Sequence, residues 1–103
     1  MSKVYNKLVR DKIPEIIKQN GQRCTYKILD DESYITMLDK KLDEELAEYH
    51  SDQNIEELAD LLEVLYAAAR ARGYSIEELQ EVREKKLEDR GGFDKRIMLI
   101  ECE

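Results

Sequence analysis

Apolar residues recur at steps of three and four over residues 31–49, which predicts a helix with one buried stripe. The stripe consists of Ile35, Leu38, Leu42, Leu46 and Tyr49. A second helix is expected over residues 55–72, where apolar side chains fall on nearly every side, so several neighbours should cover it. The short polar connection between the two predicts that they are antiparallel neighbours.

Two further helices are marked by their ends. Pro14 suits a first helical turn and Gly21 suits a left-handed stop, which together predict a short helix over residues 13–20. Ser75 and Glu78 form an S-x-x-E capping box that opens a third long helix, which ends at a Gly-Gly pair. The chain is therefore expected to be mainly α, an antiparallel helical bundle.

Two short segments have the alternating pattern of strands. Residues 22–29 and 96–101 alternate apolar and polar side chains, and they could pair as a small two-stranded sheet at one end of the helical body. The length of 103 residues predicts a single domain, residues 1–103. Within it, residues 1–12 are polar and basic and are expected to form an arm.

Composition narrows the classes of function. Charged residues make up 40% of the chain and hydrophobic ones 42%, as in an ordinary helical globular protein. The formal net charge of −7 argues against broad binding to a nucleic acid polymer. No apolar run approaches the roughly 18 to 20 residues of a membrane span. The two cysteines form no disulfide framework and no secretory leader is recognised, so we expect a cytoplasmic protein.

Two pairs of acids carry the clearest chemical signal. Glu45 and Glu48 lie in Glu-x-x-Glu spacing on one expected helix, and Glu57 and Asp60 lie in Glu-x-x-Asp spacing on the next. Four carboxylates that converge repel each other unless a cation holds them, and Mg²⁺, or Mn²⁺ in its place, prefers such oxygen ligands. The simpler alternatives are a solvated helix face, or an ordinary capping role for Glu57 beside Asn54.

Basic residues offer two readings. Arg83, Lys86 and Arg90 fall on the same side of the last helix as its apolar stripe. They could pair with acids of neighbouring helices or lie over apolar surface, and they could equally contact a phosphate group.

Four stretches together resemble a known superfamily. They are KLDEELAEY at 41–49, IEELADLLEVL at 55–65, YNKLVRDKIPEII at 5–17 and KKLEDRGGFDKRIMLIE at 85–101. The chain is similar to the all-α nucleoside triphosphate pyrophosphohydrolases, the MazG-like and phosphoribosyl-ATP pyrophosphatase-like superfamily. The last two stretches resemble one small branch of it.

The resemblance implies a helical bundle that forms homodimers or homotetramers. It further implies an enzyme that cleaves nucleoside triphosphates between the α and β phosphates, giving a monophosphate and pyrophosphate, in a house-cleaning role. The ligands of Mg²⁺ would be Glu45, Glu48, Glu57 and Asp60. The candidates for contacts with the substrate phosphates are Lys86, Arg90, Arg83, Lys7 and Arg10.

The expected mechanism is metal-assisted hydrolysis, in which a polarised water attacks in line. Glu44 or one of the four metal ligands, such as Glu45, would accept the proton of that water, and the sequence does not choose between them. Two other functions stay open. One is hydrolysis of phosphoribosyl-ATP by the same acids, and the other is a non-catalytic acidic helical module that serves self-association.

Overall fold

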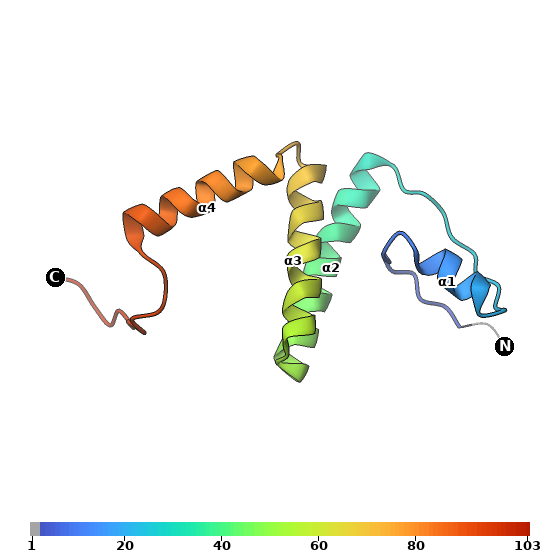
Figure 1. Ribbon diagram of the computed structural model, residues 1–103, viewed down its shortest axis with the longest axis horizontal. Helices are drawn as coiled ribbons and strands as arrows, with labels where there is room; N and C mark the ends of the chain where they lie inside the picture. The colour runs from blue at the N-terminus through green and yellow to red at the C-terminus, as the bar shows by residue number, and fades with distance from the viewer. Residues whose placement is uncertain (1–2) are drawn as a thin grey trace.

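The computed structural model describes residues 3–103, which form four helices (Figure 1). They are α1 (Ile13–Gln19), α2 (Asp31–Asp52), α3 (Ile55–Ala71) and α4 (Ile76–Arg90). No strand occurs within residues 3–103. The prediction of a mainly α fold is confirmed, and the prediction of a small two-stranded sheet is wrong.

Helices α2 and α3 form an antiparallel hairpin at the centre of the molecule (Figure 1). Each helix begins at a side-chain cap, which satisfies a backbone N–H of the first turn. Asp30 accepts a hydrogen bond from the Ser33 amide at 2.8 Å, and Asn54 accepts one from the Glu57 amide at 2.9 Å. Between the helices Gln53 adopts a left-handed conformation, with φ of 52°, which reverses the chain within a few residues.

The hairpin buries little apolar surface. Among the described residues, Leu38 on α2 is the one buried apolar side chain, and Glu45 on the same helix is the one buried charged side chain. One stripe of α3 stays about half exposed or more; it consists of Ile55, Leu58, Leu62 and Leu65. The covering that the sequence predicts around α3 is therefore supplied only in part by this chain.

Helix α4 leaves the hairpin at its upper end in Figure 1 and runs away from α2. The predicted capping box is present: the Ser75 hydroxyl accepts from the Glu78 amide, and the Glu78 carboxylate accepts from the Ser75 amide. Gly73 in the preceding turn has φ of +92°, a conformation that favours glycine. Of the described helices, α4 packs against α3 alone.

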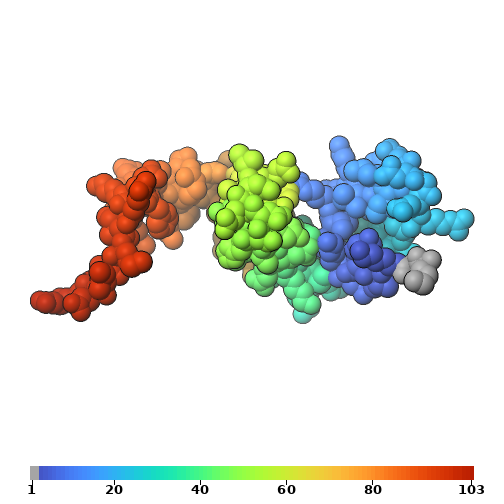
Figure 2. All heavy atoms as spheres, turned by 90° about the horizontal axis from the view of Figure 1, so that it is seen from below, coloured from blue at the N-terminus to red at the C-terminus, as the bar shows by residue number. Residues whose placement is uncertain are grey.

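The two segments expected to be strands lie at opposite ends of the molecule. The chain is elongated, 61 Å along its longest axis, with residues 22–29 on one side of the hairpin and residues 96–101 beyond α4 on the other (Figures 1 and 2). Strands need a partner for their backbone groups. Because the segments cannot meet within one chain, neither forms a ladder. Across residues 3–103 no helix has the length and apolar character of a membrane span.

Candidate metal centre

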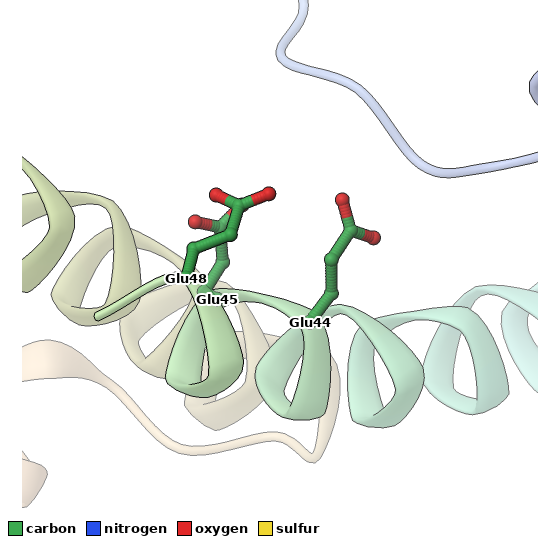
Figure 3. A group of neighbouring side chains, drawn as sticks. All are labelled: Glu44, Glu45 and Glu48. Carbon is green, nitrogen blue, oxygen red and sulfur yellow. The ribbon is translucent and has the colours of Figure 1, made fainter. Parts of the chain in front are cut away.

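The predicted acidic residues converge where α2 and α3 lie side by side. Two groups of three carboxylates form there, in each of which one oxygen per residue lies within 4.8 Å of the others. The first group joins Glu44, Glu45 and Glu48, and the second joins Glu45, Glu57 and Asp60. Glu45 belongs to both. Figure 3 shows the side chains of the first group rising from the same side of α2.

Glu45 is the centre of the cluster and its side chain is only 8% exposed. One of its oxygens, Oε1, lies 3.3 Å from the Lys41 Nζ, while the other, Oε2, is buried with no hydrogen-bond partner among the described residues. Burial raises the pKa of the Glu45 carboxyl, and the negative charge of Glu48 raises it further against the opposing effect of Lys41. A buried oxygen without a partner is costly, and a bound cation would satisfy it.

Glu57 repeats this pattern from α3. Its Oε2 atom is also buried without a hydrogen-bond partner among the described residues. Loss of solvation raises the pKa of the Glu57 carboxyl, and the charges of Asp52, Asp60 and Glu45 raise it further. Two orphaned carboxylate oxygens from two helices are thus held in one place.

Glu44 lies at the edge of the cluster and is held differently. Its Oε1 atom lies 3.2 Å from the Lys41 Nζ and 3.3 Å from the Lys7 Nζ. Partial burial tends to raise the pKa of the Glu44 carboxyl, but the hydrogen bonds and charges of Lys41 and Lys7 outweigh it, so the net pKa is lowered. Glu44 is therefore a well-stabilised carboxylate.

Lys41 is the functional candidate that the sequence prediction missed. It lies three residues before Glu44 and four before Glu45, a spacing that places a cation beside both acids on one helix face. Burial tends to lower the pKa of the Lys41 ammonium, but Glu44 and Glu45 outweigh that effect and raise it. This i,i+4 signal was readable in the sequence.

The N-terminal arm brings its two predicted basic residues to the acids. Besides the pair of Lys7 with Glu44, the Arg10 Nη2 atom lies 2.7 Å from the Asp60 Oδ1. The basic residues predicted on α4 do not join them: Arg83 contacts Gln80 and Glu84 of its own helix, and Lys86 and Arg90 lie further along α4, which does not pack against α2. Among the described residues, Lys7, Arg10 and Lys41 are the cations paired with the cluster.

The capping alternative for Glu57 is tested by the hydrogen bonds at the start of α3. Asn54 does cap this helix through the Glu57 amide. The reciprocal bond of a capping box, which the Asn54 amide would donate to the Glu57 carboxylate, is not formed in the described structure, although α4 has the corresponding bond. The Glu57 side chain is thus free for the acidic cluster.

A comparison with known proteins finds a partial match. No protein-family model matches the chain, and no solved structure matches it. A protein of Mycolicibacterium smegmatis, described as uncharacterized, is 51% identical over 41 residues, which cover 40% of this chain and 42% of that protein. The chain thus spans less than half the length of the relative it matches, and that protein's description names no activity.

Proposed function

We propose that this protein is a Mg²⁺-dependent nucleoside triphosphate pyrophosphohydrolase that cleaves between the α and β phosphates and releases a monophosphate and pyrophosphate. The observation that carries the proposal is the buried Glu45 carboxylate with its unpartnered oxygen, facing Glu57 and Asp60 from the neighbouring helix. Repulsive carboxylates held this close are typical of a site for a hard divalent cation. The resemblance of the acidic segments to nucleotide pyrophosphohydrolases supplies the reaction.

The donor set fits the ion. Mg²⁺ is usually bound by a few carboxylates and keeps open positions for water and substrate phosphates. Glu45, Glu57 and Asp60 would hold it, and Glu48 belongs to the other group of carboxylates that shares Glu45. When bound, the metal would neutralise phosphate oxygens and polarise a water. Arg10 of the arm would bind the negative charge that remains on the phosphates.

The pKa directions describe the site before a metal binds. Lys41 and Lys7 hold the pKa of the Glu44 carboxyl low, while burial and neighbouring acids raise the pKa values of Glu45 and Glu57. A cation held by Glu45 and Glu57 would lower the pKa values of both, because it stabilises the carboxylate form. Glu44 is not in the group that would hold the metal, so it stays a candidate acceptor of the proton from the attacking water, beside the ligands themselves.

The direct test is pyrophosphate release from a panel of normal and damaged nucleoside triphosphates, with phosphoribosyl-ATP included, in Mg²⁺, in Mn²⁺ and in excess chelator. We expect at least one substrate to be cleaved only with metal. Asp60→Asn should abolish that turnover while the helical circular dichroism spectrum is kept, and Asp89→Asn on α4 is the matched control. Turnover in Asp60→Asn or in chelator would refute the proposal, and cleavage of phosphoribosyl-ATP alone would select the narrower activity.

Self-association is part of the proposal, because one chain is not compact. A compact monomer of 12.2 kDa exposes about 6,100 Å² and has a radius of gyration of about 13 Å. This chain exposes 9860 Å² and has a radius of gyration of 18.1 Å. The difference in area exceeds what one partner buries in a standard interface, about 800 Å². A homodimer or homotetramer would cover the exposed stripe of α3.

Light scattering coupled to size exclusion tests this part. We expect a mass of two or four chains for the natural sequence and a smaller mass for Leu62→Glu, because Leu62 is 46% exposed in the single chain and lies in the middle of the α3 stripe. Circular dichroism checks that the helices remain. A monomeric natural protein, or an unchanged mass in Leu62→Glu, would contradict this assembly.

A further inference from the structure

The N-terminal arm is tied to the acidic cluster by two ion pairs that span long stretches of sequence. Lys7 reaches Glu44, which is 37 residues away on α2, and Arg10 reaches Asp60, which is 50 residues away on α3. Before Ile13 the described arm has no helix of its own. Its position across the hairpin therefore depends in large part on these two contacts, and Figure 3 shows the Glu44 carboxylate directed toward the arm.

The two contacts fall on different parts of the cluster. Asp60 belongs to the group with the orphaned oxygens of Glu45 and Glu57, whereas Glu44 belongs to the group on α2 alone. A cation that binds Glu45, Glu57 and Asp60 would meet the Arg10 guanidinium already bound at 2.7 Å to Asp60. The guanidinium and the metal are both positive, so they compete for this carboxylate.

We infer that the arm is a strap that exchanges counter-ions: Arg10 neutralises Asp60 in the metal-free protein, is displaced when the metal binds, and then binds the phosphates that accompany the metal. This inference rests on the proposed function. Lys7, held at Glu44, keeps the strap in place during the exchange. The chain takes three steps from Lys7 to Arg10 and spans up to about 10 Å when extended, enough for the guanidinium to move from Asp60 to a nearby phosphate.

The chemistry of arginine suits both positions. Its planar guanidinium forms charge-assisted hydrogen bonds with carboxylates and with phosphates and never loses its charge. The pair with Asp60 is partly exposed, with 59% of the Arg10 side chain and 40% of the Asp60 side chain accessible. Such an exposed pair is weak, so a divalent ion can displace it. Arg10 therefore opposes the bare metal and assists the metal with its phosphates.

The experiment compares two probes on the full chain at 0.15 M salt: Mn²⁺ alone, followed by electron paramagnetic resonance, and Mn²⁺ with inorganic tripolyphosphate, followed by calorimetry. Arg10→Gln should bind Mn²⁺ alone up to about fivefold more tightly, because the competing cation is gone. The same variant should bind the Mn²⁺–tripolyphosphate complex about tenfold more weakly. The two effects have opposite signs.

The matched control is Arg72→Gln, which also removes an exposed arginine paired with an acid of α2, Asp39, at 3.2 Å. Arg72 and Asp39 do not belong to the acidic cluster, and salt at this concentration screens charges that lie more than about 8 Å apart. Both affinities should therefore change less than twofold in Arg72→Gln. Equal behaviour of the two variants, or an unchanged Mn²⁺ affinity in Arg10→Gln, would overturn the strap while metal-dependent turnover of the natural protein still stood. Failure of the natural protein to bind Mn²⁺ would overturn both proposals.

Discussion

Glu57 and Glu78 occupy the same position in two successive helices, the third residue after the N-cap, yet their side chains do different things. Glu78 turns back to accept a hydrogen bond from the Ser75 amide and completes a capping box. Glu57 has a capping residue before it as well, Asn54, but its carboxylate leaves one oxygen buried and unpartnered beside Glu45 and Asp60. Both helices begin with a capping residue that is followed three positions later by Glu. The acids of the neighbouring helix α2 therefore account for the different role of Glu57.

The Glu-x-x-Glu spacing also occurs on two helices with different outcomes. Glu45 and Glu48 on α2 have a counterpart on α4, where Glu81 and Glu84 have identical spacing. Both residues on α4 are exposed, since α4 contacts α3 only near its start, whereas Glu45 is buried against α3. Spacing brings two acids to one helix face, and only a second acid-bearing helix turns that face into a candidate metal site.

The largest expected difference between the two acid pairs is in metal-linked stability and turnover. Mg²⁺ at about 100 times its dissociation constant should stabilise the natural protein by about 2.7 kcal/mol. Glu45→Gln should lose most of this gain, and its pyrophosphate release should fall at least about 100-fold. Thermal melts with and without Mg²⁺, paired with a pyrophosphate assay, measure both quantities.

Glu81→Gln on α4 is the control for that experiment, and it should keep the metal response and the turnover of the natural protein. The same metal response and turnover in Glu45→Gln and Glu81→Gln would contradict the assignment of the metal site to Glu45. A melting temperature of the natural protein that does not depend on Mg²⁺ would favour the non-catalytic alternative, in which the acids only keep the chain soluble.

The next difference concerns two lysine–acid pairs with the same i,i+4 spacing. Lys41 lies 3.3 Å from Glu45 with 16% of its side chain exposed, and Lys85 lies 3.1 Å from Asp89 with 75% exposed. Without metal, Lys41→Gln leaves a buried carboxylate without its cation and should cost about 2 kcal/mol of unfolding free energy. Lys85→Gln should cost less than about 0.5 kcal/mol. Urea unfolding measures both.

The dependence on salt concentration further distinguishes the two lysine–acid pairs. Raising the salt concentration should erase the small effect of Lys85→Gln, because the charges of an exposed pair are screened, and should leave most of the effect of Lys41→Gln. Equal costs for the two substitutions would mean that Glu45 is not buried in solution as the structure places it.

A smaller effect of opposite sign is expected for Glu45→Gln without metal. The amide oxygen can still accept from Lys41, but the negative charge that repels Glu48 and Glu57 is gone. The variant should therefore be more stable than the natural protein by about 1 kcal/mol, or several degrees in melting temperature. Glu81→Gln should stay within about 0.5 kcal/mol. Loss of stability in Glu45→Gln without metal would show that the carboxylate is structural.

The helices and their ends were predictable, because the signals that set them are local. The sequence predicts helices over residues 13–20, 31–49 and 55–72, and the structure has Ile13–Gln19, Asp31–Asp52 and Ile55–Ala71. The hydroxyl and carboxylate of the α4 capping box lie three residues apart, so their bond follows from the chain itself. The convergence of Glu45 with Asp60 follows from the short connection, which makes two helices antiparallel neighbours.

Long-range placement was not predictable in the same way. The alternating segments at 22–29 and 96–101 have a strand pattern, but a strand needs a partner and the fold separates the two. The basic residues of α4 share a helix face with its apolar stripe, yet the direction in which α4 leaves α3 decides whether they reach the acids. The contact of Arg10 with Asp60 joins residues 50 positions apart, and no periodicity encodes it.

The smallest expected effect is a pair of opposite pH dependences for two adjacent residues, without metal. The folded-state pKa of Glu45 is raised, chiefly by burial, above the unfolded value of about 4.3. Between the unfolded pKa and the higher folded pKa, the folded state binds more protons than the unfolded state. The contribution of Glu45 to stability is therefore largest below pH 4.3 and falls as the pH rises through the folded pKa.

The pKa of Glu44 is lowered, since Lys41 and Lys7 outweigh the effect of burial. Its contribution is present above the unfolded pKa and is lost as the pH falls through the folded pKa. Between pH 3 and pH 7, the unfolding free energy of the natural protein minus that of Glu45→Gln should therefore decrease, and the same difference for Glu44→Gln should increase. Urea unfolding at intervals across this range measures both slopes, and two slopes of the same sign would contradict the arrangement in which Lys41 and Lys7 hold Glu44 while Glu45 is left with an unpartnered oxygen.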